Sequence, residues 1–178
     1  MAWRELEKSA DNVWAKFDEL YRFHPSSGMN NEIIPKKAPT LYREYHVKVN
    51  MIAYTFNENE DLTPTYTDAE KQVREAFKEI FGDFAYALDW QHTCYEFNPN
   101  EAYPQNEFGE WLVPFFPDGD YHFFLDKSMQ AGWLGHPWRR TITIIGARAI
   151  NIVEEKQFDF LEYGVLGVFD VLRRTKCL

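Results

Sequence analysis

The sequence predicts an α+β fold: one antiparallel sheet of about five strands, with two or three helices packed on one face. Two patterns lead to this class. Apolar residues recur at three- and four-residue steps over 3–21 and 68–81, which is the spacing of amphipathic helices. Elsewhere in the chain, several segments alternate apolar and polar residues, as half-buried strands do. The length of 178 residues suits one unit, so we expect a single globular domain over 1–178.

Each predicted helix is defined by one apolar stripe. The stripe of the first comprises Trp3, Leu6, Ala10, Val13, Trp14, Phe17, Leu20 and Tyr21. The stripe of the second comprises Ala69, Val73, Ala76, Phe77 and Ile80, and Gly82 supplies the expected stop. A third helix near the C-terminus is indicated by Leu161, Val165, Phe169 and Leu172. Two glycines in that last segment weaken its helical propensity.

The predicted strands lie in 41–56, 84–97 and 141–146, and "ARAINIV" at 147–153 is a further candidate. The apolar runs 111–116 and 120–125 flank Pro117-Asp118-Gly119, a turn sequence, so they predict a hairpin. Alternation places Tyr121, Phe123 and Leu125 toward the core. It places Asp120, His122, Phe124 and Asp126 on the opposite, half-solvated face.

Net charge and motif content exclude several functions. The chain carries 28 acidic and 19 basic residues, a net charge of −9, which opposes binding to a phosphate backbone. We therefore expect no nucleic-acid partner. The sequence shows no apolar signal segment and no membrane-spanning run, so we expect a cytoplasmic protein without a membrane partner. The two cysteines lie far apart and form no metal-ligand spacing, so we expect no metal and no cofactor.

Six residues are candidates for a site: Asp89, Trp90, His92, Asp120, His136 and Trp138. Asp89 lies in mid-strand and needs a partner, because burying an unpaired carboxylate is costly; an arginine such as Arg139 would make this a structural ion pair. His136 lies between Gly135 and Pro137, which hold it in an extended conformation. It is either a ligand contact or base, or a buried histidine satisfied by the backbone. We expect Asp120 and His136 to lie close together beside Trp90 or Trp138.

The segments "LDWQH", "WLVPFFPDGDYHFF" and "GHPW", in this order, resemble a bacterial family of unknown function, DUF2716. "WAKFDELYRFHPS" and "FDVLRR" are similar to that family's ends, so the resemblance covers most of the chain. It singles out Asp89, Trp90, His92, Tyr95, Pro117, Asp118, Gly119, Asp120, Tyr121, Gly135, His136, Pro137 and Trp138. It implies that these motifs lie together in space, and it implies no activity. His122 and Arg139 depart from the family pattern, which argues against catalytic roles there and suggests a surface position for His122.

Three functions remain open at this point. We favour a non-enzymatic binding or interaction module with a protein partner, of which a toxin-neutralising immunity protein is one form. The second is an enzyme of unknown reaction in which His136 and His92 act with Asp120. The third is a small-molecule sensor with tryptophan walls formed by Trp90, Trp111 and Trp138. A deep pocket at the histidines favours the second or third, and an open acidic surface favours the first.

Overall fold

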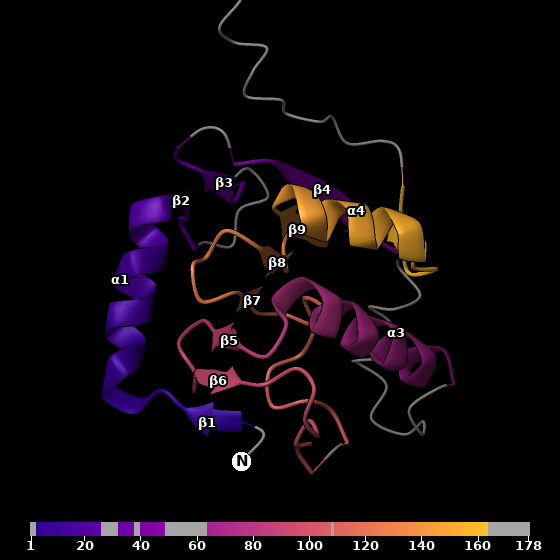
Figure 1. Ribbon diagram of the computed structural model, residues 1–178, viewed down its shortest axis with the longest axis horizontal. Coiled ribbons are helices and arrows are strands. Elements are labelled where there is room, and N and C mark those ends of the chain that lie inside the picture. Colours follow the sequence, from indigo (N-terminus) through magenta and orange to yellow (C-terminus); the bar gives the residue numbers. More distant parts are fainter. Residues whose placement is uncertain (1–2, 26–31, 38–39, 49–63, 108, 164–178) are drawn as a thin grey trace, which may run out of the picture.

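The computed structural model describes residues 3–25, 32–37, 40–48, 64–107 and 109–163 (Figure 1). Their main feature is an eight-stranded sheet in which every neighbouring pair is antiparallel. Its strands are β1 (Trp3–Glu5), β4 (Tyr42–Val47), β5 (Ala85–Asp89), β6 (Tyr95–Phe97), β7 (His122–Leu125), β8 (Gly132–His136), β9 (Thr141–Ile145) and β10 (Leu161–Glu162). They lie in the order β1-β6-β5-β7-β8-β9-β4-β10.

The α+β class is confirmed, and the predicted number of strands is too low: the sheet has eight strands rather than about five. Strands β1 and β6 have three residues each and β10 has two, too few to show an alternating pattern. A separate small ribbon pairs β2 (Tyr21–Arg22) with β3 (Ile34–Pro35). Short strands of this kind are fixed by their neighbours in the sheet rather than by local sequence.

Helices cover both faces of the sheet, which corrects the expectation of one covered face (Figure 1). Helices α3 (Pro64–Phe81) and α4 (Ala147–Lys156) pack on one face, where the Phe77 ring lies 5.5 Å from that of Trp133. Helix α1 (Ala10–Leu20) packs on the other, where Phe17 stacks on Phe123 at 5.2 Å. Consequently β7, β8 and β9 are buried on both sides, and the half-solvated face predicted for 120–126 is wrong at His122 and Phe124.

The first helix is shorter than predicted. It begins at Ala10, after a 3-10 turn at Glu7–Ser9, whereas Trp3–Glu5 forms the edge strand β1 beside β6. Trp3 stacks on Phe97 with ring centroids 4.5 Å apart, so this first residue of the predicted helical stripe belongs to a strand. The second helix ends at Phe81 and is followed by Gly82 in a left-handed conformation (φ 71°), as predicted.

The hairpin expected around Pro117–Gly119 is not formed. Residues 111–116 form no strand of the sheet. They pack into the core beside α3, where Trp111 Nε1 donates to Glu70 Oε1 at 2.5 Å. The hairpin instead joins β7 to β8. In its turn the Asp126 carboxylate accepts from the backbone N–H groups of Gln130 and Ala131, at 2.7 and 2.8 Å. Aspartate is the residue that turns of this kind favour.

Two further expectations concern the C-terminal third. Residues 147–153 belong to helix α4 rather than to a strand, since Gly146 (φ 91°) ends β9 and the chain then turns onto the sheet. The predicted C-terminal helix falls mostly outside the described residues, and Leu161 lies in β10. The predicted strand over 41–56 is present as β4, and its continuation beyond residue 48 also lies outside the described part of the chain.

Candidate functional site

The polar residues of the site gather where β5 ends and β7 begins. The two strands are antiparallel, and Asp89, the last residue of β5, lies directly opposite His122, the first residue of β7. Side chains that lie opposite each other on neighbouring strands share a face. The chain just before β7 adds Asp118 and Asp120. We call Asp89, His92, Asp118, Asp120 and His122 the acid–histidine cluster.

A tight turn after β5 brings His92 back over Asp89, so the expected mid-strand position of Asp89 is wrong: the predicted strand over 84–97 is broken after Asp89. Gln91 takes a left-handed conformation (φ 67°), and the His92 backbone N–H donates to the Asp89 carbonyl at 3.3 Å. The ring nitrogen Nδ1 of His92 then lies 3.0 Å from Asp89 Oδ1 and 3.5 Å from Asp120 Oδ2. Asp120 is oriented by the backbone N–H of Tyr121, which donates to its Oδ1 at 2.7 Å. One imidazole is therefore placed between two carboxylates.

His122 is the buried member of the cluster, with only 4% of its side chain exposed. Its Nε2 lies 2.6 Å from Asp118 Oδ1, a distance at which an imidazole N–H donates to a carboxylate. Its Nδ1 lies 3.6 Å from Asp89 Oδ1, which is too long for a hydrogen bond, and it has no hydrogen-bond partner among the described residues.

Burial and pairing act in opposite directions on Asp89. Desolvation raises the pKa of its carboxyl group and outweighs the neighbouring histidines, which lower it. The pKa of His92 is raised, first because the ring hydrogen bonds to Asp89 and also because of the negative charge of that carboxylate. His92 is the solvent-facing member: 61% of its side chain is exposed.

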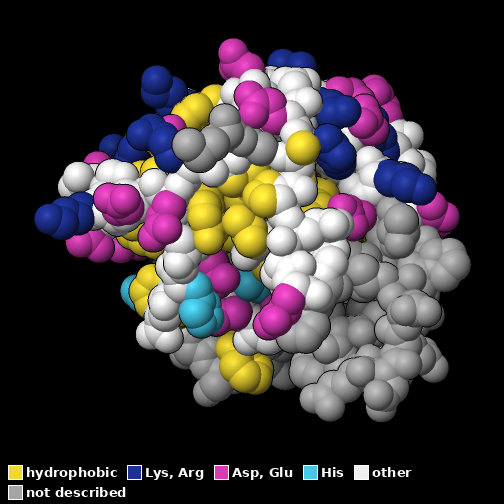
Figure 2. Space-filling view, turned by 90° about the horizontal axis from the view of Figure 1, so that it is seen from below, with side chains coloured by type: hydrophobic (Ala, Val, Ile, Leu, Met, Phe, Trp, Pro, Cys, Tyr) yellow, Lys and Arg dark blue, Asp and Glu magenta, His cyan; other side chains and the backbone are white. Residues whose placement is uncertain are grey.

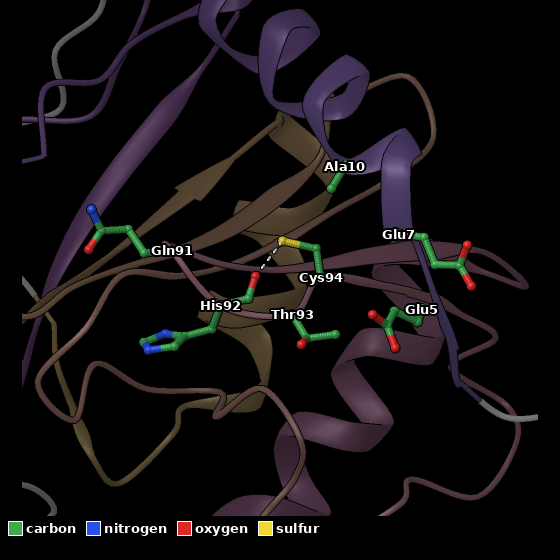
Figure 3. Close-up of a pocket in the computed structure, with 7 residues that line it drawn as sticks. All are labelled: Glu5, Glu7, Ala10, Gln91, His92, Thr93 and Cys94. Atoms are coloured by element: carbon green, nitrogen blue, oxygen red, sulfur yellow. Dashed lines mark hydrogen bonds between the residues drawn. The ribbon is translucent and has the colours of Figure 1, made fainter.

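A hollow of about 470 Å³ opens beside His92. Its walls come from β1, the 3-10 turn, α1 and the chain between β5 and β6: Glu5, Glu7, Ala10, Gln91, His92, Thr93 and Cys94 (Figure 3). The His92 ring points away from Glu5 and Glu7, so it faces the cluster while its backbone lines the hollow. The Cys94 thiol donates to the His92 carbonyl at 3.7 Å, and burial raises its pKa. Figure 2 shows histidine and acidic side chains gathered on this surface beside an apolar patch.

The structure brings three of the six predicted site residues together, namely Asp89, His92 and Asp120. Trp90 points to the α1 side, where its ring lies 5.2 Å from Trp14. His136 is buried; its ring packs on Tyr121 at 4.9 Å, and its Nδ1 accepts from the backbone N–H of Arg139.

Asp120 and His136 lie at the same end of the sheet, because Tyr121, the residue after Asp120, packs its ring against that of His136. Their side chains nevertheless contact different groups. Trp111 is buried in the core on the α3 side and Trp90 packs against the core on the α1 side, so the tryptophans do not form one wall; Trp138 is 45% exposed. Asp89 is paired with histidines rather than with Arg139, which instead binds Glu44 through two nitrogens, at 3.0 and 2.6 Å.

The motifs "PDGDY" and "GHPW" do meet, through Gly135. A Cβ at this position would lie 3.2 Å from the His122 carbonyl oxygen and 3.4 Å from Pro117, which is tighter than ordinary packing. Glycine thus lets the loop that carries Asp118 and Asp120 lie against β8.

Sequence reasoning missed two members of the cluster. Asp118 was assigned to turn geometry. His122 was expected at the surface, but its side chain is buried. The signal that identifies them is their i, i+4 spacing across the start of a strand, which lets the carboxylate reach back to the ring.

Comparison with known proteins supports the resemblance noted in the sequence. A family model described as "Protein of unknown function (DUF2716)" matches residues 5–150. The uncharacterized protein YxiI of Bacillus subtilis (strain 168) is 36% identical over 157 residues, which cover 86% of this chain and 93% of that protein. No solved structure matches the chain significantly. Among the described helices, none is both long and apolar enough to cross a membrane.

Proposed function

The chain belongs to the DUF2716 family of proteins of unknown function, and from that premise we propose that it is a non-enzymatic binding module for a partner protein with a basic surface. The contact surface is the hollow beside His92 together with the acid–histidine cluster. An immunity protein that neutralises a toxin in the cytoplasm is one concrete form of this function. The open, acidic character of this surface carries the proposal.

Several features support binding rather than chemistry at this surface. Glu5 and Glu7 are exposed on one wall of the hollow, and Asp89 and Asp120 lie behind His92. These carboxylates are part of the acidic excess that gives the chain its net charge of −9. Charges of one sign gathered in a hollow steer an oppositely charged partner and set its orientation, since the potentials of the two surfaces are complementary. Lysine and arginine side chains are the groups that such a surface recognises.

Selection of a phage-displayed random peptide library on the immobilised protein tests this proposal. We expect the enriched peptides to be rich in lysine and arginine, and to lose binding to the double variant Glu5→Lys/Glu7→Lys. The matched control is Glu155→Lys/Asp159→Lys, which changes the net charge equally on exposed residues of α4 and the segment after it. Peptides without basic residues, or equal loss in both double variants, would contradict the proposal.

An enzyme is the second candidate, and the pairing of His92 with Asp89 favours it. A carboxylate that accepts from Nδ1 orients an imidazole and fixes its tautomer, as general acid–base catalysis requires. A screen of chromogenic ester, amide and phosphodiester substrates distinguishes the two functions. Turnover that disappears in His92→Gln would favour the enzyme over the binding module.

A further inference from the structure

We propose that Asp89, His92 and Asp120 form a binding site for a divalent transition-metal ion, and that Zn²⁺ is an ion this geometry fits. The site overlaps the proposed contact surface at the acid–histidine cluster, but the exposed Glu5 and Glu7 of the hollow are not among its ligands, so the two can be tested separately. The three ligands do not form a sequence motif for metal binding, because they come from β5, the turn after it and the loop before β7. Strand pairing alone brings these segments together.

The spacing of the ligand atoms carries the first part of the argument. Zn²⁺ binds imidazole nitrogen and carboxylate oxygen at about 2.0–2.2 Å, so two ligands of a tetrahedral ion lie roughly 3.3 Å apart. His92 Nδ1 is 3.0 Å from Asp89 Oδ1 and 3.5 Å from Asp120 Oδ2, on either side of that value. One ligand atom from each of the three residues lies within 4.8 Å of the others.

The chemistry of the donors decides the class of ion. One imidazole with two carboxylates is a mixed nitrogen and oxygen set, which suits Zn²⁺ and its neighbours better than Mg²⁺ or Ca²⁺, which prefer oxygen alone. The ion takes the place of the proton that Nδ1 shares with Asp89, and the neutral ring keeps its other proton on Nε2. Since 61% of the His92 side chain is exposed, an ion can enter the site from solvent.

His122 supplies an independent observation. Its side chain is 4% exposed, and its Nδ1 points toward Asp89 Oδ1 at 3.6 Å without a hydrogen-bond partner. Leaving a buried polar atom unsatisfied is energetically costly. Because Nε2 carries the ring proton that Asp118 accepts, Nδ1 presents a lone pair, and a cation held by Asp89 accounts for this nitrogen by binding that lone pair. Asp118, at 2.6 Å from Nε2, then completes a carboxylate–histidine pair of the kind that orients metal ligands.

Calorimetric titration of the chelator-treated full-length protein with ZnCl₂ tests the site. We expect one Zn²⁺ per chain and a rise in melting temperature with Zn²⁺. His92→Gln and Asp120→Asn should each abolish or strongly weaken binding. Asp118→Asn, which acts through His122, should weaken it roughly 10- to 100-fold. Substitution with Co²⁺ should give the visible absorption of a tetrahedral ion in the wild type and not in His92→Gln.

Two controls make the result specific. His24→Gln removes an exposed histidine outside the site and should leave the Zn²⁺ affinity unchanged. Glu5→Lys/Glu7→Lys should impair peptide capture without loss of the Zn²⁺ site, so failure of the metal site and failure of the partner surface can be told apart. The proposal is overturned if folded wild type gives no binding, if His92→Gln binds as wild type does, or if Mg²⁺ at equal concentration binds as tightly.

Discussion

At the scale of single residues, one hydrogen bond controls the charge at the mouth of the site. The Asp89 carboxylate lies 3.0 Å from His92 Nδ1 and raises the pKa of that imidazole. A histidine whose pKa is raised on folding adds stability that is fully present below its unfolded pKa. That contribution is lost as the pH rises through the folded pKa.

We therefore expect NMR titration of the metal-free protein to place the pKa of His92 above the ordinary histidine value. Asp89→Asn should lower this pKa, because it removes the charge and weakens the acceptor. Glu5→Gln changes a nearby carboxylate that does not contact the ring and should have little effect. A His92 pKa that is unchanged by Asp89→Asn would refute the assignment.

Gly119 is the second position where a single residue can be tested, because its backbone conformation favours glycine. Its φ of 144° lies in a region that favours glycine, and nothing lies within 4 Å of where its Cβ would be. Gly119→Val should therefore destabilise by backbone strain, about 1–3 kcal/mol. Gly119→Ala should lose a comparable amount, because crowding at Cβ is not the cause. Urea denaturation measures both, and wild-type midpoints for the two variants would show that the backbone relaxes freely here.

At the scale of elements, helix α1 depends on a few aromatic contacts with the sheet. Phe17 is fully buried and stacks on Tyr21 and Phe123, at 4.8 and 5.2 Å. Phe17→Ala should cost about 3–5 kcal/mol in free energy of unfolding, the usual range for a buried phenylalanine. Glu19→Ala, on the exposed side of the same helix, should stay within about 0.5 kcal/mol of wild type. Equal denaturation midpoints for the two variants would mean that α1 contributes little to the fold.

Elements with a strong local pattern are the ones that the sequence predicts. The α3 stripe with its Gly82 stop and the β-branched run of β9 appear where they are expected, whereas the predicted strand over 84–97 is divided by a turn into β5 and β6. Trp3–Glu5 is different, because it is a strand only through its pairing with β6. Helix α4 was mistaken for a strand because its isoleucines and valine satisfy either period over so short a segment.

The candidate site was predicted only in part, because local motifs are visible in the sequence and contacts between strands are not. Asp89 and His92 were found because both lie in one short motif, and Asp120 because turn geometry left it unexplained. His136 is a sequence candidate because its position between Gly135 and Pro137 predicts an extended conformation. Gly135 instead makes room for the neighbouring loop, and His136 packs on Tyr121. Contacts across strands, such as that of His122 with Asp118, depend on register and burial, which one sequence does not reveal.

At the scale of the whole molecule, the net charge of −9 opposes binding to nucleic acid. Binding to nucleic acid depends on lysine and arginine neutralising phosphates, so an acidic surface repels the duplex. We expect no shift of duplex or single-stranded DNA in gel-shift titrations at physiological salt. Micromolar binding that weakens as salt is raised would contradict this expectation, since it is the signature of phosphate contacts.

The aromatic core gives the molecule a second global property, sensitivity to alkali. Burial raises the pKa of Tyr163 to about 12, and it also raises the pKa values of Tyr21, Tyr45 and Tyr103. In the unfolded chain these phenols ionise near pH 10. Below that pH both states are neutral and the stability is fully present. As the pH rises from about 10 toward the folded values, only the unfolded state ionises, and the free energy of unfolding falls.

Tyr103 allows this effect to be isolated. Its hydroxyl group is buried and has no hydrogen-bond partner among the described residues, so Tyr103→Phe removes an ionisable group without breaking a bond. At neutral pH the variant should be as stable as wild type or slightly more stable, because a buried unsatisfied hydroxyl is costly. Above pH 10, urea denaturation should show a smaller loss of stability per pH unit in Tyr103→Phe than in wild type. Lysine deprotonation contributes equally to both proteins, so parallel curves would mean that Tyr103 ionises as readily in the folded state as in the unfolded one.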